Sequence, residues 1–178
     1  IGDAFAARYD LPRDDVLIAS TGVIGFRLPM DKVLAGIEAL ALDSMDGVDV
    51  ATAMLTTDAG PKSVAVEVPL AAGTVRLGGA AKGAGMIHPN MATMFGFLTT
   101  DAALDPGHAR ELLRPAVDGS FNLISIDGDQ STSDTVLLFA NGAAGDAPIE
   151  PGSDDAAMFA RALDAVTRWL AREMVRGG

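Results

Sequence analysis

The C-terminal segment from Ser153 to about Val175 constrains the fold more than any other part of the sequence. Its large apolar residues recur every three or four positions, which predicts one amphipathic helix of about 22 residues. These residues are Phe159, Leu163, Val166, Leu170 and Met174. Ser153 belongs to the residue types that cap helix N-termini. Because such a helix is stable mainly when its apolar face is covered, the chain needs a surface to pack against it.

Strand-like segments supply that surface. Apolar residues alternate over 63–68, Gly73 predicts a turn into 74–77, and short apolar runs at 94–99 and 135–140 are typical of buried strands. The same reasoning predicts strands at 16–19 and 121–126. Helical patterns cover Ile1–Tyr9, Met30 to about Asp43, and the segment after Asp105-Pro106. The elements follow no strict βαβα rhythm, so this pattern fits an α+β fold as well as a parallel α/β fold.

Composition narrows the function. The chain has 178 residues, 49% of them hydrophobic and 21% charged, which is typical of one folded domain and excludes a disordered chain. No apolar run approaches the roughly 18 residues of a membrane span. A net charge of −11 argues against a nucleic-acid partner. The lack of cysteine excludes disulfides, thiol catalysis and cysteine-ligated zinc.

The ends of the chain suggest a piece of a longer protein. It starts at Ile1 rather than Met, directly in a helical pattern, and stops at Arg176-Gly-Gly. No charged segment followed by an apolar stretch indicates a signal peptide. The lack of cysteine permits a reducing cytoplasm.

Two glycine-containing segments are candidates for chemistry. The stretch 78–90 holds four glycines and Lys82, one of three lysines in the chain. Glycines let the backbone bend around a ligand and leave N–H groups free, although a tight turn with a solvated Lys82 is the simpler interpretation. The spacing does not fit a phosphate-binding P-loop. In Ser20-Thr-Gly-Val-Ile-Gly25, a hydroxyl and a backbone N–H could point the same way, as in an oxyanion hole, or the segment is a plain turn.

The acidic segment Asp127–Asp134 also has alternatives to a solvated loop. It lacks the Gly and the Glu that a calcium-binding loop carries at fixed positions. It fits an aspartyl-phosphate phosphatase better, with Asp127 as nucleophile, Asp129 as acid/base and bound Mg²⁺. The two histidines are too isolated for a metal site; we expect His108 to be solvated and His88 to lie in a turn.

The run Lys82-Gly-Ala-Gly-Met-Ile-His-Pro-Asn-Met-Ala-Thr-Met94, followed by Thr99-Thr-Asp-Ala, closely resembles the self-cleavage segment of the ornithine acetyltransferases. These are bifunctional glutamate N-acetyltransferases of arginine biosynthesis. Further stretches match in the family's order. They are Ser20–Gly25 with Leu28–Asp31, Thr56–Lys62, Ser120–Asn122 with Ile126–Asp129 and Ser131–Thr135, and Asn141-Gly142. The resemblance runs from about Asp14 to the last residue.

The resemblance implies a self-processing enzyme with an N-terminal threonine nucleophile and an α+β fold of sheets packed between helices. Cleavage would fall between Ala92 and Thr93, so residues 1–92 would belong to the α chain and 93–178 to the β chain. Thr93 would be the nucleophile, with its freed α-amine as base. Thr21 and Gly22 match the family's oxyanion-hole pair. Thr56, Lys82 and Thr93 match substrate-binding positions, although Thr57 competes with Thr56.

The implied substrates are N-acetylornithine and glutamate, with an acetyl-threonine intermediate and with α and β chains that form a heterotetramer in the cytoplasm. No metal or other cofactor is implied, and acetyl-CoA stays open as an acetyl donor. Asp127, Asp129 and Asp134 belong to the pattern without an assigned role. The family proteins are longer than this chain, so an inactive or uncleaved fragment is one alternative. A related acyltransferase or aminopeptidase and the Mg²⁺ phosphatase are the others.

Overall fold

The computed structural model describes residues 1–42, 47–88, 94–129, 131–145 and 147–177. The chain divides into two compact units, Ile1–Asp46 and Gly47–Gly178. The described part is a mixed α+β structure with five α-helices and four strands, which confirms the predicted class. The described strands form one sheet, whereas several sheets were expected.

The N-terminal unit consists of two short helices and their connection. Helix α1 (Gly2–Tyr9) is followed by the 3₁₀ turn η1 (Arg13–Asp15) and by α2 (Met30–Ala39). The Tyr9 hydroxyl donates a hydrogen bond to the carbonyl of Leu40 at 2.6 Å. This bond and the buried side chains of Ala6 and Ile37 hold the helices together.

Two predictions for this unit are wrong. Residues 16–19 form no strand, because the described part of this unit offers no strand to pair with, and Leu17 is exposed. Helix α2 ends at Ala39, before the expected boundary at Asp43. Leu40 has an extended backbone and is also exposed. Its place in the apolar periodicity made the predicted helix longer than the observed one.

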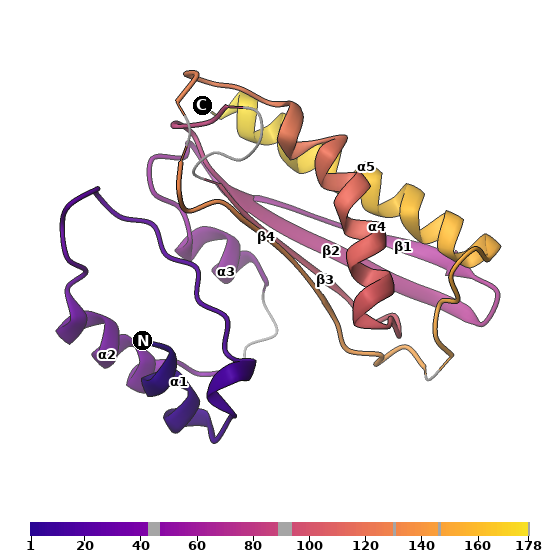
Figure 1. The fold of residues 1–178 in the computed structure, drawn as a ribbon, viewed down its shortest axis with the longest axis horizontal. Coiled ribbons are helices and arrows are strands. Elements are labelled where there is room, and N and C mark those ends of the chain that lie inside the picture. Colours follow the sequence, from indigo (N-terminus) through magenta and orange to yellow (C-terminus); the bar gives the residue numbers. More distant parts are fainter. Residues whose placement is uncertain (43–46, 89–93, 130, 146, 178) are drawn as a thin grey trace. The chain divides into compact units, whose positions relative to one another are not determined.

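The second unit is built on a four-stranded sheet in the order β1-β2-β3-β4 (Figure 1). The strands are β1 (Lys62–Leu70), β2 (Gly73–Lys82), β3 (Phe95–Thr100) and β4 (Thr135–Ala140). The first three run antiparallel, and β4 runs parallel to β3. Gly73 turns the hairpin between β1 and β2 with a φ of 143°, a conformation that favours glycine.

Helices α4 (Pro106–Asp118) and α5 (Asp154–Arg176) lie side by side over one face of the sheet (Figure 1). The predicted apolar face of α5 is confirmed, since Phe159, Leu163 and Leu170 are fully buried. The Ser153 hydroxyl accepts a hydrogen bond from the N–H of Ala156 and caps α5, as predicted. The short helix α3 (Gly47–Ala53) lies against β1 and β2, next to residues on the face of the sheet that α4 and α5 do not cover.

Three further expectations are corrected in this unit. Residues 121–126 form no strand but a 3₁₀ turn, η2 (Phe121–Leu123), in which Phe121 is buried in the core. Strand β2 continues to Lys82, so the first glycines of the 78–90 stretch lie in the sheet rather than in a turn. His108 is 8% exposed instead of solvated, because it faces the interior at the start of α4.

Within the described residues, no helix has both the length and the apolar character needed to cross a membrane.

Candidate functional site

The structure brings two of the predicted site residues to one end of the sheet. Lys82 is the last residue of β2, and Thr56 lies in the exposed loop that follows α3. Thr21 and Gly22 belong to the N-terminal unit, where Thr21 is half-buried and Gly22 is exposed. The predicted cleavage pair Ala92 and Thr93 lies outside the described residues.

Asp58 holds the loop that contains Thr56 (the Thr56 loop) next to Lys82 through hydrogen bonds. Its side chain is fully buried, and Oδ1 accepts hydrogen bonds at 2.7 Å from Lys62 Nζ and from the backbone N–H of Gly83. Oδ2 accepts a third, at 3.3 Å, from the N–H of Thr56. The carboxylate therefore joins the start of the Thr56 loop to the residue directly after Lys82.

The environment of Asp58 favours its charged form. Burial by itself would raise the pKa of Asp58, but the Lys62 ammonium and the N–H groups of Gly83 and Thr56 outweigh it. The pKa of Asp58 therefore lies below its ordinary value. Lys62 is itself 4% exposed, so the two side chains form a buried ion pair with few competing water contacts.

Lys82 is among the largest fully buried side chains of the described residues, with 1% exposure. Its Nζ lies 4.7 Å from the centroid of the Phe95 ring, its register partner on β3. Burial lowers the pKa of Lys82, although the charges of Asp58 and Asp134 act in the opposite direction. Lys82 can thus offer a weakly hydrated positive charge beside the start of β3.

Asp134 binds the backbone at the start of β3. Its Oδ1 accepts a hydrogen bond from the N–H of Met94 at 2.7 Å, and Met94 directly follows Thr93 in sequence. Its Oδ2 is buried and has no hydrogen-bond partner among the described residues. Burial raises the pKa of Asp134, while the Met94 N–H and the Lys82 charge lower it in part.

Asp127 also binds the backbone. Its carboxylate accepts hydrogen bonds from the N–H groups of Met86, of Ile87 at 3.0 Å and of Asp129 at 3.2 Å. The bond from Met86 is the largest cause of a lowered pKa at Asp127. Both oxygens accept backbone hydrogen bonds that stabilise the carboxylate and so make it a weaker nucleophile, which argues against the phosphatase alternative. Among the described residues, no group of three His, Asp or Glu side chains is arranged to hold a metal ion.

The same contacts correct the idea that the glycine-rich stretch offers free N–H groups. The N–H groups of Gly83, Met86 and Ile87 are bound by Asp58 and Asp127. Met86 has a φ of 55°, so this bend does not depend on glycine alone.

Sequence reasoning missed the buried partners of the predicted site residues. Asp58 and Lys62 lie inside a matched motif without an assigned role. Their i, i+4 spacing would predict an ion pair only in a helix, whereas Asp58 lies in a loop and Lys62 begins β1. The family resemblance assigns no role to Asp127 and Asp134. Their hydrogen bonds connect positions about 40 residues apart, which no local pattern reveals.

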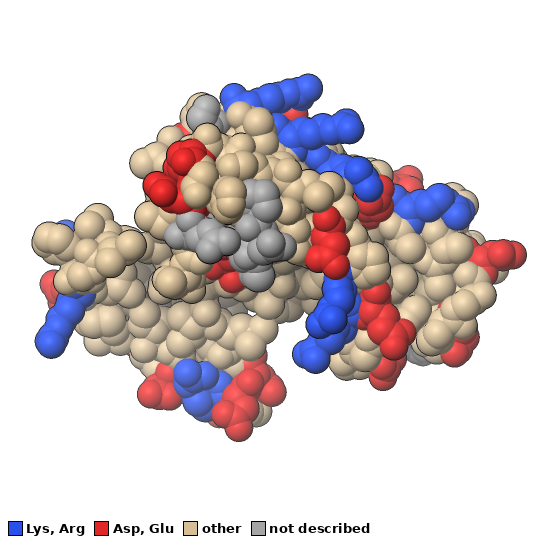
Figure 2. Space-filling model, turned by 45° about the horizontal axis from the view of Figure 1, so that its top comes forward, with Lys and Arg blue, Asp and Glu red and all other residues tan. Residues whose placement is uncertain are grey.

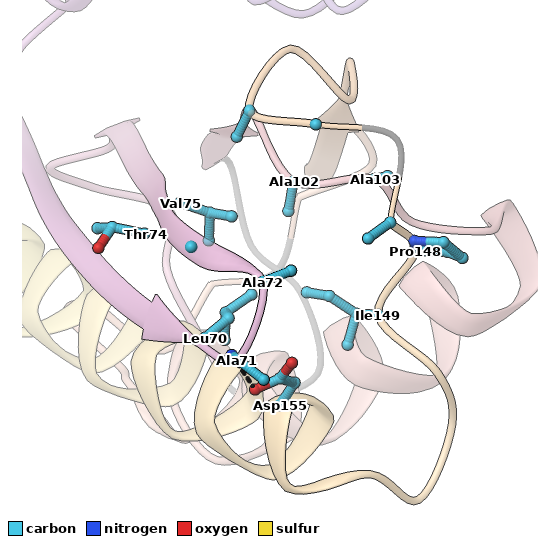
Figure 3. A pocket seen from close by; sticks show the side chains of 14 residues that line it. Leu70, Ala71, Ala72, Thr74, Val75, Ala102, Ala103, Pro148, Ile149 and Asp155 are labelled. Carbon is cyan, nitrogen blue, oxygen red and sulfur yellow. Dashed lines mark hydrogen bonds between the residues drawn. The ribbon is translucent and has the colours of Figure 1, made fainter.

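A separate pocket of about 200 Å³ lies at the other end of the hairpin (Figure 3). Its walls come from the turn between β1 and β2 and from the segments around Ala102 and Pro148. Asp155 lines it and accepts a hydrogen bond from the N–H of Ala71 at 2.9 Å. Neither Thr56 nor Lys82, the two described residues predicted to bind substrate, lines this pocket.

Surface charges are locally mixed. Figure 2 shows Lys and Arg side chains lying among Asp and Glu side chains on the face it draws. Arg168 on α5, for example, pairs with Asp164 one turn earlier, with Nε 2.7 Å from Oδ2.

Comparison with known proteins matches the ArgJ family over residues 1–178. The chain is 55% identical to the arginine biosynthesis bifunctional protein ArgJ of Symbiobacterium thermophilum, over 90% of this chain and 40% of that protein. It is 49% identical to the protein of the same name from Chlorobium chlorochromatii, over 100% of this chain and 42% of that one. The match from Shouchella clausii is 47% identical over 97% of this chain and 42% of the relative.

A crystal structure of ArgJ from Bacillus halodurans is also similar, with 39% sequence identity and a TM-score of 0.44, over 46% of this chain and 38% of that one. The chain spans about two fifths of the length of the curated relatives it matches. The family match covers both units, including the motifs around Thr21, Thr56, Lys82 and Thr93. This chain belongs to the ArgJ family.

Proposed function

We propose that the protein is an acetyltransferase of arginine biosynthesis that moves acetyl from N-acetylornithine to glutamate and activates itself by cleavage between Ala92 and Thr93. The observation that carries this proposal is the buried Lys82 beside the start of β3, with the Thr56 loop fastened next to it. The relatives' name supports the pathway, since they are called arginine biosynthesis bifunctional proteins.

Self-cleavage would create the nucleophile. The Thr93 hydroxyl attacks the Ala92 carbonyl, the peptide bond shifts to an ester, and water then splits the ester. The products are residues up to 92 on the α chain and a β chain that begins with Thr93. The new α-amine has an ordinary pKa near 8, so it can accept the proton of its own hydroxyl. No histidine is needed for this step.

Acetyl transfer would then proceed in two halves. Thr93 Oγ attacks the acetyl carbonyl of N-acetylornithine, the amide C–N bond breaks, and the ornithine amine leaves with the proton. The amine of glutamate attacks the acetyl ester in turn, which releases N-acetylglutamate and returns the proton to the hydroxyl. Thr21 and Gly22 would donate to the oxyanion, a contribution of about 10²- to 10³-fold in rate per donor.

Lys82 and Thr56 would bind substrate. A buried ammonium with a lowered pKa is well suited to pair with a substrate carboxylate, because little water competes for either charge. Both substrates carry a carboxylate on the same carbon as the reacting nitrogen. We propose that the reaction needs no metal or other cofactor and that α and β chains assemble as a heterotetramer in the cytoplasm. Supplying acetyl-CoA in place of N-acetylornithine tests whether it is a second acetyl donor.

A denaturing mass spectrum of the purified protein tests the proposal. We expect two polypeptides whose masses meet at the Ala92–Thr93 bond, and one uncut polypeptide for Thr93→Ala. Thr99→Ala, on the exposed side of β3, serves as the matched control and should cleave normally. A single intact species for the unaltered protein would contradict self-activation. Cleavage without transfer of acetyl between the two amino acids would contradict the substrates.

A further inference from the structure

The acidic loop 125–135 contacts the chain on both sides of the segment 88–93. On the N-terminal side, Asp127 accepts hydrogen bonds from the N–H groups of Met86 and Ile87. The N–H of Ile126 and the hydroxyl of Ser125 donate to the carbonyl of Ile87 at 2.8 and 3.2 Å. Ile87 is thereby bound through both its N–H and its carbonyl.

On the C-terminal side, the other end of the same loop binds Met94 in the same way. Asp134 accepts from the N–H of Met94 at 2.7 Å, and the N–H of Thr135 donates to the carbonyl of Met94 at 3.1 Å. Both Ile87 and Met94 are also buried in the hydrophobic core, with 1% and 4% exposure. One loop thus fixes the backbone at two points, seven positions apart.

We propose that Asp127 and Asp134 are positioning residues that hold the two ends of the self-cleaved segment, with Asp134 also holding the N-terminal threonine in place for acetyl transfer. This inference rests on the proposed function. Hydrogen bonds from backbone N–H to a carboxylate are stronger than neutral ones, so each aspartate is a firm anchor. When both ends of a short segment are fixed, the segment has fewer conformations in which the Thr93 hydroxyl and the Ala92 carbonyl would be far apart.

The two aspartates differ in what they hold after cleavage. Met94 stays on the β chain, one residue from the new N-terminus, so Asp134 continues to fix the residue that carries the nucleophile. Met86 and Ile87 stay on the α chain, behind the cut. Asp127 is therefore needed for cleavage, whereas acetyl transfer by already cleaved protein depends on it much less.

This division gives the test. Cleavage rate is followed in the complete protein by intact mass, and the acetyl-transfer kcat is normalised to the cleaved fraction. We expect Asp134→Ala to slow both reactions by about 10²-fold, the scale of an ångström-sized misplacement. Asp127→Ala should slow cleavage by a similar factor and leave kcat within about threefold. The exposed Asp129→Ala, in the same loop, should change neither reaction.

Conservative variants separate positioning from charge. In Asp134→Asn the amide oxygen can still accept from the Met94 N–H, so we expect cleavage and kcat within about threefold of the unaltered protein. Asp127→Asn keeps only one accepting oxygen where two are used, so its cleavage rate should fall between those of the unaltered protein and Asp127→Ala. Equal losses for Asn and Ala at position 134 would overturn the positioning role.

Amide hydrogen exchange makes the inference testable even without cleavage. Asp127→Ala should speed exchange at Met86 and Ile87 but not at Met94, and Asp134→Ala should do the reverse. If the unaltered protein is not cleaved, the proposed function is contradicted. The exchange rates alone then test the positioning role. Unchanged exchange at all three amides, or losses of cleavage and kcat in equal proportion for both alanine variants, would overturn it.

Discussion

Lys82 and Phe95 are register partners on neighbouring antiparallel strands, and the Lys82 ammonium lies 4.7 Å from the centroid of the Phe95 ring. The ring face is electron-rich, so it stabilises a positive charge that burial otherwise disfavours. Asp58 and Asp134 add the electrostatic attraction of two carboxylates. The structure thus keeps a positive charge at the edge of the core, beside the start of β3.

The first prediction concerns substrate binding. Lys82→Met should lower kcat/KM for acetyl transfer by about 10²- to 10³-fold, mainly through a raised KM, because a charge-assisted bond to the substrate carboxylate is lost. Met fills a similar volume without a charge, so the fold should remain intact. Lys32→Met, at an exposed lysine of α2, is the control and should keep the unaltered kcat/KM. An unchanged KM in Lys82→Met would contradict the assigned role.

The second prediction concerns the buried pair of Asp58 and Lys62. Lys62→Met leaves the Asp58 carboxylate buried without its ammonium, which should cost about 3–5 kcal/mol in the free energy of unfolding. The double variant Asp58→Asn/Lys62→Met should recover part of this loss, because no charge stays buried. Urea unfolding of the four proteins of the cycle gives the coupling energy. Strictly additive effects would show that the pair is not coupled.

The third prediction follows from the lowered pKa of Asp58. A carboxyl whose pKa is lower in the folded than in the unfolded state stabilises the fold at pH values above its ordinary pKa of 3.8. That contribution is lost as the pH falls through the folded-state value. Urea midpoints measured from pH 6 down to pH 2 should therefore fall less steeply for Asp58→Asn than for the unaltered protein. Parallel curves would contradict the electrostatic account.

The fourth prediction concerns the packing of β2 against α5. A Cβ added at Gly79 would lie 2.6 Å from Leu98 Cδ2 and 3.0 Å from Leu170 Cδ1, so Gly79→Ala should destabilise the unit by about 1–3 kcal/mol. Gly78→Ala, the adjacent position on the opposite face, meets its nearest atom at 3.6 Å and should change stability little. Thermal unfolding compares the two variants directly, and equal losses would contradict the close approach of helix and sheet.

The sequence predicted the elements whose stability comes from a regular apolar face. Helix α5, its Ser153 cap and strand β4 were all found within one residue of the structure, because periodicity and capping are local signals. The errors fall where tertiary contacts decide. Residues 16–19 have no strand to pair with in the described part of their unit. Phe121 is buried by a 3₁₀ turn instead of a strand.

The predicted site shows the same division. Lys82 and Thr56 came from a motif, and the structure places them at one end of the sheet. The roles of Asp58, Asp127 and Asp134 depend on hydrogen bonds to backbone N–H groups far away in sequence. Backbone donors are common to almost every residue type, so no residue pattern marks them.

Trapping the acetyl group on the protein tests the central claim most directly. The purified protein is mixed with N-acetylornithine in the absence of glutamate, quenched in acid, digested and mapped by mass spectrometry. We predict one acetyl group on the peptide that begins with Thr93, bound as an ester, which disappears when glutamate is added before quenching. An acetyl group at another residue, or none on a protein that still makes N-acetylglutamate, would contradict the acetyl-threonine mechanism.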